Sequence, residues 1–180
     1  MQKHNSGRHF LQIPGPTNIP DRILRAIEQP TIDHRGPDFK RLTKEVLEGI
    51  KKIFITEQPV IIYPGSGTGA WEAALVNTLS PGDKVLMYDT GHFSTTWYKI
   101  ACKLGLDAQL LPGNWRNGAR PNEIENILID DKKKTIKSLC IVHNDTSTGI
   151  TSNIPDIRDA IERTGHPSLF MVDTISSLAS

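Results

Sequence analysis

The segment that decides the fold is PVIIYPGSGTGAWEAALVNTLSPGDKVLMYD, residues 59–89. Two short apolar runs, 59–63 and 84–89, lie on either side of a stretch with helical periodicity at 68–79. An apolar run without polar alternation predicts a strand covered on both faces, and a helical crossover between two such strands predicts parallel pairing. The segment therefore predicts a strand–helix–strand unit of an α/β protein.

The same alternation continues to the end of the chain. It predicts helices at 93–104, 121–129 and 154–163 and strands at 108–112, 138–144 and 168–173. We therefore expect one mostly parallel sheet flanked by helices, with right-handed connections.

Two helices are predicted before the sheet. A short one begins at Asp21, and a longer one carries an apolar stripe that predicts packing against other protein: Phe39, Leu42, Val46, Ile50 and Ile53. We predict an N-terminal arm over residues 1–58 and part of a large domain over 59–180, without a second domain inside these 180 residues.

Composition excludes several classes of partner. A formal charge of +1 gives no electrostatic footprint for nucleic acid, and no stretch is apolar enough for a membrane span. Cys102 and Cys140 are too few for a disulfide framework or a metal site, so we expect two buried thiols and no metal. These features predict a cytoplasmic protein with small-molecule ligands, although organelle targeting from a C-terminal signal stays open.

The loop GSGTGA, residues 65–70, connects a predicted strand to a predicted helix. Glycines allow close backbone approach, and the free N–H groups of a helix start favour an anion, so phosphate is the natural ligand. A Walker A loop is excluded because no lysine ends the motif. Gly65, Gly67 and Ala70 fit a relaxed dinucleotide fingerprint, with Asp89 as the ribose-binding acid. An NAD(P)-binding Rossmann-type domain is therefore one alternative.

Asp173 follows the last predicted strand. A carboxylate at this position either caps the next turn or holds a cationic ligand atom. The protonated ring nitrogen of pyridoxal 5'-phosphate is such an atom, because a fixed carboxylate raises its pKa. The phosphate loop and Asp173 would then serve a single ligand.

Five blocks of sequence carry a family resemblance, and they occur in order along the whole chain: PGPTNIP, TIDHRGPDF, SGTGAWEAALVNTLSPGD, VHNDTSTG and MVDTISSLAS. With them the chain resembles the N-terminal part of the class V, fold-type I aminotransferases that depend on pyridoxal phosphate, most closely the serine–glyoxylate type. Two positions depart from the family pattern, Gly65 where relatives often have Ala and Asp145 where they often have Glu.

The resemblance implies roles for matching residues. Ser66, Gly67 and Thr68 would bind the cofactor phosphate, and Asp173 would pair with the ring nitrogen. Phe93 and Ile175 would pack on opposite faces of the ring, and Thr146 would place a hydroxyl beside it. On the substrate side the resemblance implies Gly15, together with His34 and Arg35 from the partner subunit of a homodimer.

The resemblance also implies an activity, the transfer of an amino group from serine or a similar amino acid to glyoxylate. In relatives, the lysine that forms the Schiff base and the arginine that binds the substrate carboxylate lie beyond the block MVDTISSLAS, and the small C-terminal domain follows. The 180 residues alone are therefore expected to be inactive. A non-catalytic remnant or interaction module is a further alternative.

Overall fold

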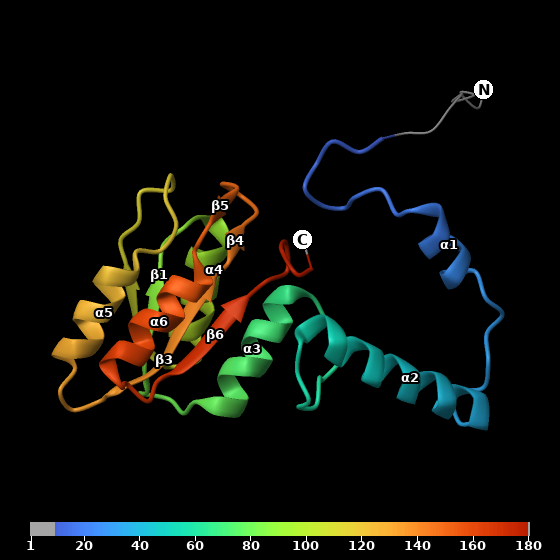
Figure 1. The fold of residues 1–180 in the computed structure, drawn as a ribbon, viewed down its shortest axis with the longest axis horizontal. Helices are drawn as coiled ribbons and strands as arrows, with labels where there is room; N and C mark the ends of the chain where they lie inside the picture. Colours follow the sequence, from blue (N-terminus) through green and yellow to red (C-terminus); the bar gives the residue numbers. More distant parts are fainter. Residues whose placement is uncertain (1–9, 180) are drawn as a thin grey trace. The chain divides into compact units, whose positions relative to one another are not determined.

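The computed structural model describes residues 10–179. The elements in chain order are α1 Asp21–Ile27, α2 Pro37–Phe54, α3 Gly67–Thr78, β1 Lys84–Tyr88, α4 His92–Lys103, β2 Asp107–Leu111, α5 Pro121–Asp130, β3 Ile136–Val142, β4 Asn144–Asp145, β5 Ile150–Thr151, α6 Ile154–Thr164 and β6 Leu169–Asp173 (Figure 1). The chain divides into two units, Met1–Ile61 and Ile62–Ser180, and each is described by itself.

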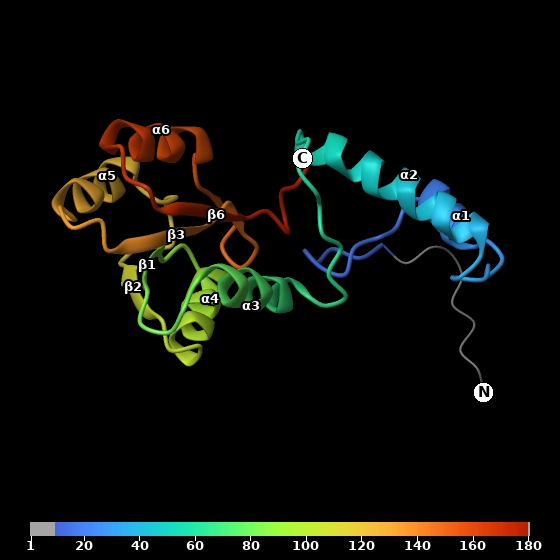
Figure 2. The ribbon, with the colours of Figure 1, turned by 90° about the horizontal axis from the view of Figure 1, so that it is seen from below.

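The second unit is built on a four-stranded sheet with the order β2-β1-β3-β6, in which every pairing is parallel. Helices α3 and α4 cover one face of this sheet, and α5 and α6 cover the other (Figure 2). This arrangement confirms the predicted mostly parallel sheet flanked by helices. The short β4 and β5 form a separate antiparallel pair within the loop after β3, which the sequence did not predict.

The burial of each strand follows its place in the sheet. The central strands β1 and β3 are buried along almost their whole length, because helices cover both of their faces. The outer strands β2 and β6 are more exposed. Two apolar clusters fill the space between the sheet and its helices. One includes Leu86, Ile124, Leu139, Ile141, Ile157 and Ile161, and the other includes Trp71, Leu75, Val85, Met87, Trp97 and Ala101.

Two predictions from the sequence are wrong. Residues 59–63 do not form a strand, and the side chain of Ile61 is 84% exposed. A strand requires a hydrogen-bonded neighbour, and within residues 10–179 the segment has none, since β6 pairs only with β3. Cys102 is exposed on α4, whereas Cys140 is buried in β3 as predicted, and burial raises the pKa of its thiol to about 12.

The first unit contains both predicted N-terminal helices. Helix α2 begins at Pro37, where a missing N–H costs no helical hydrogen bond, and it ends at Phe54, followed by the C-cap residue Ile55 in the left-handed region with φ of 50°. No residue of α1 or α2 is buried, and four residues of the apolar stripe of α2 are exposed: Phe39, Leu42, Val46 and Ile53. Within residues 10–179, no helix is both long and apolar enough to cross a membrane.

Candidate functional site

Three loops meet at the carboxyl edge of the sheet. The chain leaves β1 through α4 on one face of the sheet, and it leaves the neighbouring β3 through α6 on the other face. Connections that leave two neighbouring strands on opposite faces create a crevice at their carboxyl ends, which is where open α/β sheets bind ligands. The loops after β1 and β3 share this crevice, and the turn after β6 follows beside them.

Asp145 joins the loop after β3 to the start of α4. Its buried Oδ2 accepts the N–H groups of Phe93 at 3.2 Å and Ser94 at 3.1 Å. Its Oδ1 accepts the hydroxyl of Ser147 at 2.7 Å, and that hydroxyl oxygen in turn accepts the N–H of His92 at 2.9 Å. The first three N–H groups of α4 are therefore bonded to the neighbouring loop, which fixes the position of Phe93.

We expect Asp145→Ala to destabilise the chain by about 3 kcal/mol, because it leaves buried helix N–H groups without acceptors. Asp156→Ala is the matched control, since Asp156 also lies in the first turn of a helix, α6, but is exposed to water. Urea unfolding measures both variants, and the control is expected to lose less than about 1 kcal/mol. Equal losses of unfolding free energy in the two variants would show that the buried contacts of Asp145 add no more stability than an exposed acidic residue in the first turn of a helix.

Asp173 lies at the end of β6 with 9% of its surface exposed. Its Oδ1 accepts the N–H of Ile175 at 2.9 Å, and its Oδ2 accepts the indole N–H of Trp71 at 3.2 Å. Burial raises the pKa of Asp173, the two N–H donors oppose that rise, and the nearby Asp145 adds to it. The result is a partly desolvated carboxylate held by one donor on each oxygen, which suits a cationic N–H ligand.

An aromatic cluster lies beside this carboxylate. The ring of Trp71 stacks on that of Trp97, with centroids 5.5 Å apart and planes 10° apart. Phe93 approaches Trp71 edge-on at 6.5 Å and is partly buried. Trp71 thus contacts residues from α4 and β6 while it belongs to α3, so it links three elements that border the crevice.

The predicted phosphate loop is at the start of α3. Ser66 is the N-cap residue, but its side chain does not cap the helix, and its hydroxyl lies 2.7 Å from that of Thr68. Both side chains are exposed. A methyl group at Gly67 would lie 3.8 Å from Cγ1 of Ile175, so the helix start adjoins the turn after β6. Two hydroxyls and a helix start without side-chain caps form a suitable anion site.

Side-chain hydrogen bonds connect the loop after β3 to the turn after β6. The hydroxyl of Thr146 bonds to that of Ser176, and Nδ1 of His143 bonds to the hydroxyl of Ser177 at 2.8 Å. The backbone N–H of His143 also donates to the carbonyl of Asp173 at 2.9 Å. The turn that carries Ile175 is therefore fixed to the sheet.

The structure brings seven of the predicted site residues to this crevice: Ser66, Gly67, Thr68, Phe93, Thr146, Asp173 and Ile175. Gly15, His34 and Arg35 lie in the first unit, which is described by itself, so their roles stay predictions. Sequence reasoning missed Trp71, although the indole N–H of a buried tryptophan usually has a hydrogen-bond partner. It also gave no role to Asp145, which was noted only as a departure from the family pattern.

The dinucleotide alternative lacks two features that it requires. Between residue 10 and the glycine-rich loop there is no strand, because residues 59–63 are not one. The carboxylate of Asp89 already accepts the indole N–H of Trp115 at 2.7 Å. The loop and the acid therefore do not have the structural context of the fingerprint.

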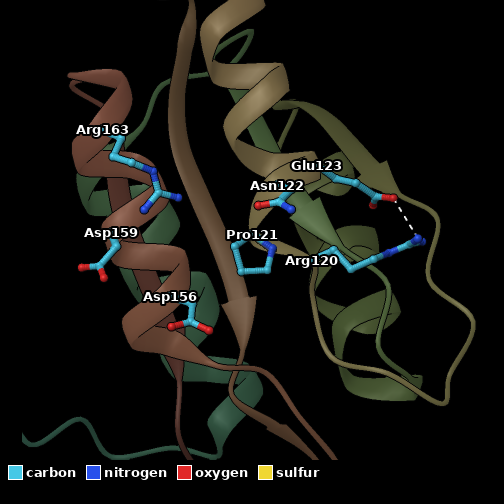
Figure 3. Close-up of a pocket in the computed structure, with 7 residues that line it drawn as sticks. All are labelled: Arg120, Pro121, Asn122, Glu123, Asp156, Asp159 and Arg163. Atoms are coloured by element: carbon cyan, nitrogen blue, oxygen red, sulfur yellow. Dashed lines mark ion pairs between the residues drawn. The ribbon is translucent and has the colours of Figure 1, made fainter.

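A second concave surface lies between α5 and α6 (Figure 3). Its lining residues are Arg120, Pro121, Asn122, Glu123, Asp156, Asp159 and Arg163. Both arginines are paired with glutamates, Arg120 with Glu123 at 3.0 Å and Arg163 with Glu125 at 2.7 Å. These ion pairs leave little uncompensated positive charge for an anionic ligand. Within residues 10–179, no group of histidine, cysteine and carboxylate side chains is arranged to hold a metal ion.

Comparison with known proteins gives consistent matches. The family model "Aminotransferase class-V" matches residues 9–180. A serine–glyoxylate aminotransferase of Methylorubrum extorquens is 50% identical over 175 residues, covering 97% of this chain and 44% of that protein. An L-aspartate–glyoxylate aminotransferase of Paracoccus denitrificans is 44% identical, covering 93% of this chain and 43% of that protein. The solved aspartate aminotransferase of Thermus thermophilus is 30% identical with a TM-score of 0.85, covering 94% of this chain and 47% of that one. The chain thus spans less than half the length of each.

Proposed function

The chain belongs to the class V aminotransferases, as its resemblance implied, and we propose that it forms the cofactor-binding part of a transaminase that uses pyridoxal phosphate. The observation that carries the proposal is that a helix start suited to bind phosphate lies beside the turn that bonds to a buried carboxylate. Gly67 in that helix start adjoins Ile175, and the N–H of Ile175 bonds to Asp173. An elongated ligand with a phosphate at one end and a cationic nitrogen at the other suits this arrangement.

Each predicted residue has a defined task in this proposal. Ser66, Gly67 and Thr68 bind the phosphate through hydroxyls and helix N–H groups. Phe93 and Ile175 would pack against the ring, and Thr146 would offer it a hydroxyl. Asp173 holds the proton on the ring nitrogen. Pyridoxal phosphate, when bound, supplies an electron sink for the reacting amino acid.

The proposed substrates are serine, or a similar amino acid, and glyoxylate. Their support is that both curated relatives named above are glyoxylate aminotransferases. Gly15, His34 and Arg35 are proposed to border the substrate, the last two from the partner subunit of a homodimer. A cytoplasmic location stays a prediction.

A homodimer is also supported by the surface of α2. Four residues of its apolar stripe are between 39% and 51% exposed: Phe39, Leu42, Val46 and Ile53. A stripe of this kind along an 18-residue helix is unfavourable in water, so we expect it to be covered by protein in the complete assembly. Analytical ultracentrifugation of the full-length protein with Val46→Lys tests this, with dissociation as the expected result and an unchanged dimer as the contradiction.

Ligand binding tests the proposed cofactor directly. We expect the chain to bind pyridoxal phosphate, and Thr68→Glu to abolish binding because it places a negative charge at the phosphate position. Thr78→Glu is the matched control, since Thr78 is an exposed residue at the other end of α3. Equilibrium dialysis with pyridoxal phosphate and with NAD in parallel provides the measurement. Binding of NAD but not of pyridoxal phosphate would overturn the proposal.

A further inference from the structure

The contact between Trp71 and Asp173 connects residues 102 positions apart. Trp71 is 6% exposed, and its ring is held by the stack on Trp97 and by the edge of Phe93. Its indole N–H points at Oδ2 of Asp173 at 3.2 Å. A buried ring with this packing has little freedom to turn, so the direction of the N–H is fixed by the core.

The two stacked indoles differ in one respect. Trp97 is 2% exposed, and its Nε1 is a buried donor for which the described residues provide no acceptor. The indole of Trp71, almost parallel to it, donates to a carboxylate. The packing of the pair therefore does not require an N–H, and the N–H of Trp71 is available for a role at Asp173.

We infer that Trp71 is a positioning residue, one that orients Asp173 and keeps it ionised; the inference rests on the function proposed above. Trp71 and Ile175 place one N–H on each oxygen of Asp173, which fixes the plane of the carboxylate. Each oxygen keeps a further lone pair for a ligand N–H. Both donors favour the charged form and so oppose burial, which raises the pKa of Asp173.

Two matched variants test the role of Trp71. Trp71→Phe removes the N–H that reaches Asp173, and Trp97→Phe removes an N–H with no acceptor among the described residues, while both keep an aromatic ring in the stack. In cofactor-free protein labelled with carbon-13 at aspartate carboxyls, NMR titration follows Asp173, whose signal is assigned with Asp173→Asn. We expect Trp71→Phe to increase the proton affinity of Asp173 about tenfold and Trp97→Phe to leave it unchanged.

The same variants are then examined with pyridoxal phosphate labelled with nitrogen-15 in its ring. We expect the ring nitrogen to lose its proton at lower pH in Trp71→Phe than in the parent or Trp97→Phe, because the carboxylate of Asp173 is no longer held in the plane that meets the ring N–H. Identical behaviour of the two variants in both titrations would overturn the positioning role. Failure of the unmutated chain to bind pyridoxal phosphate would overturn the proposed function. The carbon-13 titration would still show whether the N–H of Trp71 stabilises the ionised form of Asp173.

Folding of the variants is monitored by thermal unfolding. If Trp71→Phe does not fold, benzothienylalanine at position 71 replaces the N–H with sulfur in a ring of nearly the same shape. An unchanged titration of Asp173 in that protein would also overturn the inference.

Discussion

Replacing Asp173 with asparagine is expected to lower transamination by several orders of magnitude while pyridoxal phosphate still binds. An amide cannot stabilise a positive charge on the ring nitrogen as a carboxylate does, so the ring nitrogen loses its proton near neutral pH. The phosphate contacts at Ser66, Gly67 and Thr68 are untouched, which is why binding persists. Steady-state kinetics of a complete transaminase that contains this chain, with serine and glyoxylate, measure the effect.

Asp89→Asn is the matched control for this prediction. Asp89 follows β1 as Asp173 ends β6, and an asparagine there still accepts the indole N–H of Trp115. We expect activity within about threefold of the parent, a factor that corresponds to less than 1 kcal/mol. Retention of activity by Asp173→Asn to within tenfold of the parent would contradict the role of Asp173, whatever the control shows.

The 180-residue chain on its own is expected to show no turnover of serine and glyoxylate. The loops at the carboxyl edge of the sheet, 89–91, 112–120, 143–153 and 174–179, contain no lysine. Lys84 begins β1, and Lys137 also lies in a strand because β3 starts two residues earlier than the sequence predicted. Both are at the amino end of the sheet, away from the crevice.

Borohydride reduction in the presence of pyridoxal phosphate, followed by peptide mapping, tests this prediction. Random labelling of exposed lysines without turnover is the expected outcome. Stoichiometric labelling of a single lysine together with turnover would contradict it, and it would identify a nucleophile that the described structure does not bring to the crevice.

The sequence predicted the four strands of the parallel sheet. The runs at β1 and β3 are apolar because helices cover both faces of these central strands, so their composition reflects their environment directly. The run at β6 is also apolar, and it lies at an edge of the four-stranded sheet and is only partly buried. Residues 59–63 are equally apolar but have no pairing partner in residues 10–179. The composition of a segment does not show whether a neighbouring strand is present. The two-residue strands β4 and β5 are too short to produce any periodic pattern.

The candidate site was predictable where a residue type has one obvious chemical use. Glycines and hydroxyls at a helix start indicate phosphate, and an acid at a strand end indicates a cationic ligand or a cap. Trp71 was not predictable in this way, because a tryptophan in a helix is typical of core packing and its partner is 102 positions away. Asp145 was missed for the same reason, since its partners lie 51 and 52 positions earlier in α4.

A crystal structure of the chain with pyridoxal phosphate tests the central claim most directly. The account predicts the phosphate at the N–H groups of Gly67 and Thr68, the ring between Phe93 and Ile175, and the ring nitrogen in hydrogen-bond contact with the carboxylate of Asp173. A cofactor bound with its ring nitrogen away from Asp173, or with its phosphate away from the start of α3, would contradict it.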